Sequence, residues 1–473
     1  MKRQIFIGCL LLLLTCSSAI PLHAGGPQVI GGPHFGIPGQ PFTWDPSKMP
    51  IQYRVDPGPM AVTPGNTTVI NNAAGLQRVQ SMFAVWQSVP TAVISFSNAG
   101  QLLSAGSYIG GTDLTTVQQF NDVFGACAAG AQNPIIFDAN GQILSALGLS
   151  ASIIGFTSGC AVEQTTGHLT GALILMNGRF QDGISSSSTS PPNYELTVNE
   201  FDEAITHEIG HFLGLDHSQI NLDLLTNHVF PCDVDKLAGL PLMFPVEICQ
   251  ARKDAGLPVL SQDEVSWISS LYPKASFMSN YGTISGTIYF SDGVSHAQGV
   301  NVIARLVDDP RTPEDESRRL AVSAISGYLF TGNPGQSFTA NGTDPNEDNT
   351  NGDKTGSRDP KLIGYYQLAV PPGTYTVEVE AVYSSFVGGS SVGPLVPPAP
   401  LPGGQPEFWN KDESAFDFPL QQDTITIHAG DTVTGVDIIL NNTPSRFDQN
   451  EDSGALFDPQ PASTVALARE VRG

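Results

Sequence analysis

An eleven-residue stretch contains residues of the right types and spacing to bind a metal ion and activate water. It places His207, Glu208, His211, Gly214 and His217 in the pattern H-E-x-x-H-x-x-G-x-x-H. On a helix, His207 and His211 lie one turn apart on the same face, so their imidazoles can bind one Zn²⁺. Gly214 allows the chain to turn out of the helix, which lets His217 supply a third ligand. Three protein ligands leave a fourth position for water, and Glu208 can take a proton from that water.

Two other interpretations of this stretch remain open. The pattern H-E-x-x-H also occurs on ordinary amphipathic helices that bind no metal, and a metal centre can exist without catalytic activity. Five specified positions should match by chance in about one of ten thousand chains of this length. The intact Glu208 favours a catalytic centre over an inactive one.

Two segments downstream resemble parts of a known enzyme family. Residues 242–245 (Leu-Met-Phe-Pro) look like the Met-turn that runs beneath the zinc ligands of metzincins, and Ser218 follows the third histidine as in one metzincin branch. With the segment 260–273, these features make residues 42–275 similar to the matrixins, which are secreted zinc endopeptidases, in a bacterial form. The resemblance implies an α+β catalytic domain with a twisted sheet and two or three helices, in which Met243 supports the zinc ligands.

The chain also departs from the matrixin pattern. The step from His217 to Met243 is 26 positions, which is longer than in typical matrixins. The extra loop, residues 219–239, carries Cys232, and we expect it to shape one wall of the cleft. The sequence therefore predicts neither the preferred residues beside the scissile bond nor how the enzyme would be kept inactive before export. A metzincin outside the matrixins is an alternative. By the same resemblance, residues 173–177 are the strand that borders the cleft and pairs with an extended substrate.

Residues 1–24 have the features of a secretory signal peptide. A basic start precedes an apolar run of about ten to twelve residues, which is too short to span a bilayer. Cleavage after Ala19 or Ala24 would leave a Gly/Pro-rich lead, up to residue 41, before the catalytic domain. We predict a secreted, extracellular protein with no transmembrane segment, and lipid attachment at Cys16 is an alternative.

Four cysteines remain after removal of the signal peptide, namely Cys127, Cys160, Cys232 and Cys249. An even number of cysteines in an exported chain indicates disulfide bonds. Four cysteines allow three pairings, and sequence proximity favours Cys127–Cys160 and Cys232–Cys249. Free buried thiols are the alternative, and the spacings match no cysteine-based zinc site.

Composition excludes two classes of partner. The net charge is −24, from 45 acidic and 21 basic residues, whereas nucleic acids and anionic membranes attract concentrated Lys and Arg. The chain has 473 residues, with 49 Gly and 36 Pro, which is too long for a single core and rich in turn formers. We therefore expect two domains with tails, and protein or peptide partners.

Within residues 42–275, the periodicity predicts a few elements that position the metal ligands. Residues 71–88 carry apolar side chains on one helical face and predict a core helix. Residues 135–144 predict a hairpin with a turn in the middle. Thr197 and Glu200 form a capping box at the start of the metal-binding helix, and residues 262–271 predict the last helix of the domain.

Residues 280–442 predict an all-β sandwich domain. Alternating patterns mark strands at 283–290, 300–307, 365–370, 374–380, 425–427 and 436–440. The segment resembles carboxypeptidase regulatory-like, transthyretin-type domains. The acidic segments 344–353 and 448–454 space oxygen side chains as Ca²⁺ ligands require, but neither supplies the bidentate Glu of an EF-hand, which favours solvated acidic loops over calcium sites. We expect the acidic tail, residues 443–473, to be disordered.

The sequence thus predicts a secreted zinc endopeptidase that hydrolyses internal peptide bonds. The alternative is a zinc-containing adhesion or binding protein whose β-sandwich binds an extracellular protein or glycan. Removal of residues 280–473 would distinguish the two, because an independent catalytic domain should keep its activity while an adhesion protein should lose its binding.

Overall fold

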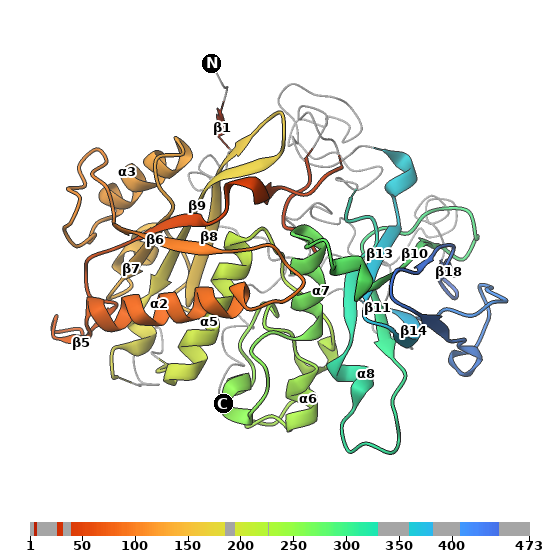
Figure 1. Cartoon of the computed structure of the whole chain (residues 1–473). Helices are drawn as coiled ribbons and strands as arrows, with labels where there is room; N and C mark the ends of the chain where they lie inside the picture. Colours follow the sequence, from red (N-terminus) through yellow and green to blue (C-terminus); the bar gives the residue numbers. More distant parts are fainter. Residues whose placement is uncertain are drawn as a thin grey trace, which may run out of the picture. The chain divides into compact units, whose positions relative to one another are not determined.

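The computed structural model describes residues 4–6, 26–31, 39–184, 194–225, 227–329, 359–381 and 407–443. It is a mixed α/β structure with several sheets and few helices (Figure 1), compatible with an α+β domain and a β-sandwich. Within these residues, no helix combines the length and apolar character needed to cross a membrane. The predicted signal peptide apart from residues 4–6, both acidic segments and the tail after residue 443 lie outside the described residues.

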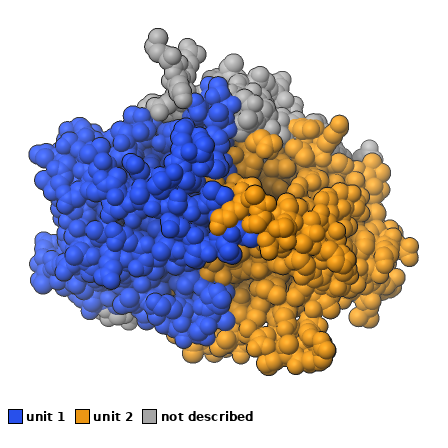
Figure 2. Space-filling model, viewed as in Figure 1, with its two compact units in different colours: residues 1–19, 42–214, 251–259 blue, residues 20–41, 215–250, 260–473 orange. Residues whose placement is uncertain are grey.

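The chain divides into two compact units (Figure 2). The first contains residues 1–19, 42–214 and 251–259, and the second contains residues 20–41, 215–250 and 260–473. The domain boundary that the sequence predicts between residues 275 and 280 stays a prediction. Most of residues 215–275 belong to the same unit as the C-terminal sheets.

The first unit contains a seven-stranded sheet with the order β1-β8-β9-β7-β3-β6, in which β2 also pairs with β9. Its strands are β1 (Gln4–Phe6), β2 (Thr43–Trp44), β3 (Ile51–Val55), β6 (Phe96–Gln101), β7 (Pro134–Asp138), β8 (Gly155–Glu163) and β9 (His168–Asn177). A separate pair is formed by β4 (Ala61–Val62) and β5 (Thr68–Ile70). Strand β8 runs antiparallel to β9, whereas β9, β7, β3 and β6 are parallel to one another. The apolar run of β9 fits its position inside the sheet, where the side chains of residues 171–177 are buried.

Four of the described helices belong to the first unit: α2 (Asn72–Gln87), α3 (Val117–Ala128), α4 (Gln142–Ala146) and α5 (Val198–Phe212). The core helix predicted at residues 71–88 is confirmed as α2, which begins at the N-cap Asn71. It buries a stripe of side chains that includes Phe83 and Trp86. The indole N–H of Trp86 donates to the carbonyl of Thr206 at 2.8 Å and so ties α2 to α5 (Figure 1).

Two expectations for this unit were wrong. Residues 173–177 do not border an open edge, because β9 pairs with β8 on one side and β7 on the other. Strand β8 lies beyond β9, and among the described residues its outer side pairs only at residues 161–163, with β1, which leaves residues 155–160 as an open edge. The expected hairpin at residues 135–144 is strand β7 followed by helix α4, because the Asp138 carboxylate accepts the Leu144 N–H at 2.8 Å and caps a helical turn.

The described part of the second unit contains two further sheets and three helices. One sheet has the order β13-β10-β17 with β18 paired to β10, and the other has the order β12-β11-β14-β15 with β16 paired to β14. We call the described part of residues 282–443 the two-sheet region. Its strands are β10 (Gly282–Tyr289), β11 (Asn301–Leu306), β12 (Val322–Ile325), β13 (Tyr365–Val370), β14 (Gly373–Glu380), β15 (Glu407–Phe408), β16 (Ile425–Ile427), β17 (Thr432–Val433) and β18 (Ile438–Ile439).

The helices of the second unit are α6 (Val234–Ala238), α7 (Gln262–Leu271) and α8 (Glu316–Arg319). Helix α7 confirms the last helix predicted for the catalytic domain. The described residues between 42 and 275 thus hold helices α2 to α7, so the expectation of two or three helices was too low. Strands β10, β11, β13, β14 and β16 lie where the alternating pattern predicted them, and the predicted segment 436–440 contains β18.

Both disulfide pairings favoured by sequence proximity are confirmed. Cys127 of α3 is bonded to Cys160 of β8, and both side chains are buried in an apolar core cluster. Cys232 is bonded to Cys249, which encloses the segment that contains Met243. Two disulfides are compatible with an exported protein.

Replacing both Cys127 and Cys160 by alanine should lower the free energy of unfolding by about 3–4 kcal/mol, because the bond joins residues 33 positions apart and restricts the unfolded chain. Denaturant titration of the oxidised protein measures this loss. The matched double variant that removes the Cys232–Cys249 bond should lose somewhat less unfolding free energy, because that bond joins residues only 17 positions apart. A Cys127/Cys160 double variant as stable as the wild type would contradict the expectation.

Helix α7 is joined to the two-sheet region through a buried carboxylate. Asp263 Oδ1 accepts the backbone N–H of Ser323 on β12 at 2.8 Å, and the indole N–H of Trp267 donates to the Ser323 carbonyl at 2.7 Å. Burial, and then the nearby Glu264, raise the pKa of Asp263 to about 8. Folding therefore favours the protonated form of Asp263.

This raised pKa predicts a pH-dependent stability. The contribution of protonated Asp263 is complete below its unfolded pKa of 3.8 and is lost as the pH rises through about 8. Asp263→Asn keeps the acceptor oxygen without the charge, so its melting temperature should fall less than that of the wild type between pH 5 and pH 8.5. Equal falls in both proteins, measured by calorimetry, would rule out this role for Asp263.

Candidate metal centre

Helix α5 begins and ends where the sequence predicts. Thr197 and Glu200 form the capping box, with the Thr197 N–H donating to Glu200 Oε2 at 2.7 Å and the Glu200 N–H donating to Thr197 Oγ1 at 3.2 Å. The helix ends at Phe212, and Gly214 takes a φ of 88°. A Cβ on Gly214 would also lie 2.9 Å from the carbonyl oxygen of Phe42, so two constraints favour glycine there.

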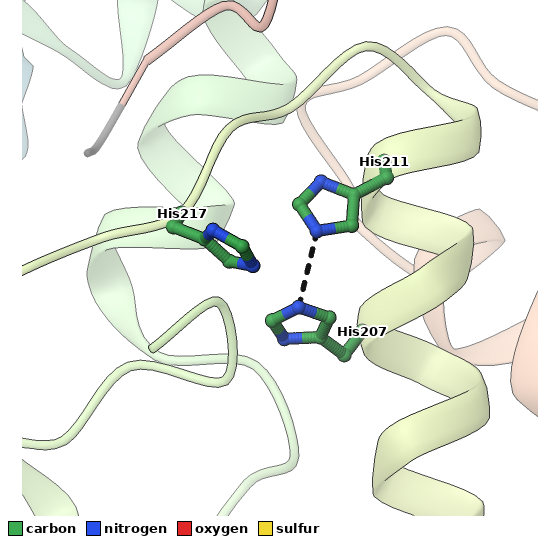
Figure 3. A group of neighbouring side chains, drawn as sticks. All are labelled: His207, His211 and His217. Atoms are coloured by element: carbon green, nitrogen blue, oxygen red, sulfur yellow. Dashed lines mark hydrogen bonds between the residues drawn. The ribbon is translucent and has the colours of Figure 1, made fainter. Parts of the chain in front are cut away.

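The three predicted histidine ligands lie together (Figure 3). One ring nitrogen from each of His207, His211 and His217 lies within 4.8 Å of the other two. The Nε2 atoms of His207 and His211 are 3.1 Å apart. Tetrahedral zinc with Zn–N bonds of 2.0–2.1 Å requires nitrogen separations of about 3.3 Å. The donor set and its spacing therefore fit one divalent ion such as Zn²⁺, with only small movements of the rings.

Backbone contacts fix the segment that carries His217. The His217 N–H donates to the side chain of Asp216 at 2.8 Å, and the next residue, Ser218, donates its N–H to the Met243 carbonyl at 2.8 Å. The Met243 N–H in turn donates to Glu264 Oε1 on helix α7 at 3.0 Å. The Met243 side chain is buried. The backbone of Met243 therefore links Ser218, the residue after His217, to helix α7.

Glu208, the predicted general base, is buried and held by strand β8. Thr157 Oγ1 donates to Glu208 Oε2 at 2.6 Å and lies 3.1 Å from the Glu208 carbonyl oxygen. A Cβ on Gly155 would lie 2.6 Å from Glu208 Cγ, so the carboxylate arm packs directly on the glycine. Burial raises the pKa of Glu208 to about 7, while the hydrogen bond from Thr157 acts in the opposite direction.

Sequence reasoning did not identify Thr157 and Gly155. They lie about 50 positions before Glu208, in a strand that the periodicity did not predict. Alternate residues of a strand face the same side, which explains why both contact one carboxylate. A Gly-x-Thr sequence carries no chemistry by itself, so no local signal could have linked it to the motif.

Comparisons with models of protein families, with curated proteins and with solved structures found no match to this chain. The similarity to matrixins therefore rests on the motif and the segments around it. The geometry of the histidines and of Glu208 stands independently of that similarity.

Thr157→Val should lower the free energy of unfolding by about 1–3 kcal/mol, because valine keeps the shape and leaves the buried Glu208 carboxyl without its donor. Thr157→Ser keeps the hydroxyl and should lose only about 1 kcal/mol for the missing methyl group. Denaturant unfolding of the two variants at one pH compares them directly. A valine variant as stable as the serine variant would show that the hydroxyl does not stabilise Glu208.

Proposed function

We propose that this protein is a secreted zinc-dependent endopeptidase of the metzincin type, similar to the matrixins. The observation that carries the proposal is the convergence of three imidazole nitrogens beside a helix whose Glu208 follows the first ligand directly. Three histidines are a ligand set that zinc enzymes use when a fourth position must stay open. The two disulfides are consistent with secretion.

The chain's own residues supply the acid–base chemistry of the proposed reaction. Zn²⁺ bound by the histidines would polarise the scissile carbonyl and increase the acidity of water. Glu208 takes the proton of the attacking water and delivers it to the leaving amine. Thr157 and Gly155 hold the Glu208 carboxylate in one position, so little reorganisation is needed during proton transfer.

The position of Glu208 beside an edge strand supports a peptide substrate. Thr157, its hydrogen-bond partner, belongs to strand β8. Among the described residues, no strand pairs with the outer edge of residues 155–160 of β8. An extended peptide could add to this edge through main-chain hydrogen bonds, and such binding would place a peptide bond near the general base.

Glu208→Gln should retain the metal and lose nearly all turnover, because the amide keeps the shape of the side chain and cannot accept the proton. We expect kcat/KM on a peptide substrate to fall by at least about a hundredfold, the lower range for general acid–base catalysis. Elemental analysis should still find one zinc ion per chain. The variant Asp412→Asn removes an exposed carboxylate of the two-sheet region and is the control that should cleave normally.

Two results would contradict the proposal. Near wild-type turnover by Glu208→Gln would remove Glu208 from the mechanism. A folded, zinc-loaded wild-type chain that cleaves no peptide would favour the alternative, an adhesion or binding protein.

A further inference from the structure

The segment that carries the third histidine is held by the two-sheet region. Asn221 lies four residues after His217, is buried, and adopts a left-handed conformation with a φ of 59°. Its Nδ2 donates to the Gly239 carbonyl at 2.6 Å, and its Oδ1 accepts from Arg305 Nη1 at 2.9 Å. Arg305 belongs to strand β11 of the two-sheet region. One buried amide thus joins the start of the loop, its end and the sheet.

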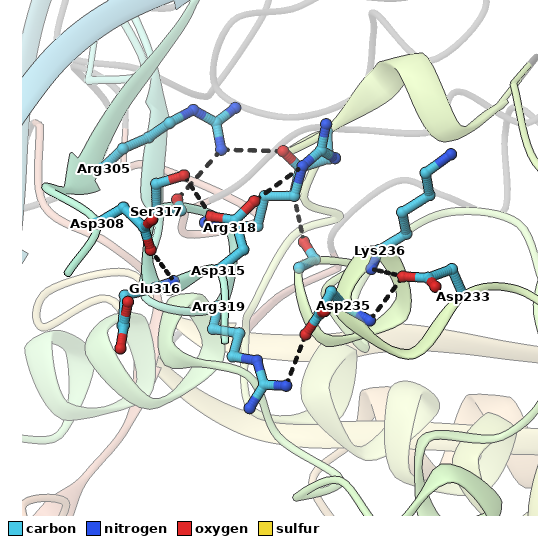
Figure 4. A network of polar contacts seen from close by, with 12 residues as sticks. Asp233, Asp235, Lys236, Arg305, Asp308, Asp315, Glu316, Ser317, Arg318 and Arg319 are labelled. Carbon is cyan, nitrogen blue, oxygen red and sulfur yellow. Dashed lines mark hydrogen bonds and ion pairs between the residues drawn. The ribbon is translucent and has the colours of Figure 1, made fainter. Parts of the chain in front are cut away.

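Arg305 is itself held by several polar groups, and Figure 4 shows its guanidinium beside Ser317, whose carbonyl accepts a hydrogen bond from it. Its guanidinium pairs with Glu378 and, at 3.0 Å, with Glu380, both on strand β14. The guanidinium is planar, so two carboxylates and Asn221 together define its orientation. Its side chain is only 12% exposed, which protects these contacts from screening by solvent. The bond from Arg305 to Asn221 is therefore a rigid link rather than a surface contact.

An apolar contact reinforces this link. Ile220, the residue before Asn221, is fully buried in a cluster with Ile303 of β11 and Ala321, the residue before β12. The loop of residues 219–239 was expected to shape one wall of the cleft. Its first residues pack on the two-sheet region, which limits how far the segment after His217 can move.

A second series of hydrogen bonds, which does not involve Asn221, also connects the two-sheet region to the segment of His217; we call the two series routes. Ser218 contacts Met243, and Met243 contacts Glu264 of helix α7. The neighbouring Asp263 accepts the Ser323 N–H of strand β12. Both routes start within four residues of His217 and end on strands of one sheet. Helix α5 carries the other two histidines, whereas both routes act on the segment of His217.

We propose that the two-sheet region positions His217 through Asn221 and Arg305 and thereby sets the affinity of the centre for its metal ion. The inference rests on the proposed function only in that the three histidines bind zinc. Groups that orient metal ligands typically affect metal affinity by about 10- to 100-fold. Half-exposed ion pairs between the same segments, such as Arg319–Asp235, contribute little, because solvent screens them.

The test measures the zinc dissociation constant of the full-length mature chain by competition with a chromogenic chelator. Asn221→Gly keeps a residue suited to positive φ and removes both hydrogen bonds. We expect zinc to bind about 10- to 100-fold more weakly, with a circular dichroism spectrum like that of the wild type. Ile220→Ala should also weaken zinc binding, because it removes the apolar contact with Ile303. Arg311→Gln, which removes an exposed arginine elsewhere in the two-sheet region, should leave it unchanged.

The outcomes separate this inference from the proposed function. If the wild type binds zinc and Asn221→Gly binds it equally tightly, the inference is wrong and the metal centre stands. If the folded wild type binds no zinc, both are wrong. The inference would also be wrong if Arg311→Gln weakened zinc binding as much as Asn221→Gly does. The loss of affinity would then follow from any change in the two-sheet region.

Discussion

The close approach of three imidazole nitrogens, within 4.8 Å of one another, is the constraint on which the rest of the structure depends. The positions of two of the nitrogens, those of His207 and His211, follow from the spacing of residues on helix α5. A capping box at Thr197 fixes where this helix begins. The third requires the helix to stop at Phe212 and the chain to turn back at Gly214. A side chain at Gly214 would meet both a conformational penalty and the Phe42 carbonyl, so the turn is specified twice. The grouping of the three histidines therefore depends on where helix α5 ends as well as on the helix itself.

Around this centre, polar groups are buried at a cost that neighbouring contacts offset. Burial raises the pKa values of both Glu208 and Asp263, and each carboxyl keeps a hydrogen-bond donor, from Thr157 and from the Ser323 backbone respectively. The first contact fixes the proposed base, and the second joins helix α7 to the C-terminal sheets. In our proposal these sheets therefore support the segment that carries His217, and the domain boundary expected between residues 275 and 280 stays a prediction. Truncation at residue 280 would expose Ile220 and Trp267, so it is a poor test of the proposed activity.

Local sequence patterns predicted many helices and strands, whereas contacts between residues far apart in the sequence were not predicted. The capping box of Thr197 and Glu200, the helix at residues 262–271 and the predicted alternating strands each reflect interactions within a few residues, and each lies where expected. Strand β8 was missed because Gly155–Glu163 mixes small and polar residues without clear alternation. Its contact with Glu208 joins residues 51 positions apart. Asn221 contacts Arg305 across 84 positions, and no periodicity of the sequence encodes such a contact.

The measurement that tests the account most directly is the cleavage of casein by the purified mature chain before zinc removal, after it, and after zinc is restored. The account predicts that internal peptide bonds are cut, that chelation abolishes the cutting, and that stoichiometric Zn²⁺ restores it. Cleavage that survives complete removal of zinc would contradict the assignment of His207, His211 and His217 as catalytic ligands. So would the absence of cleavage by a folded chain loaded with one zinc ion.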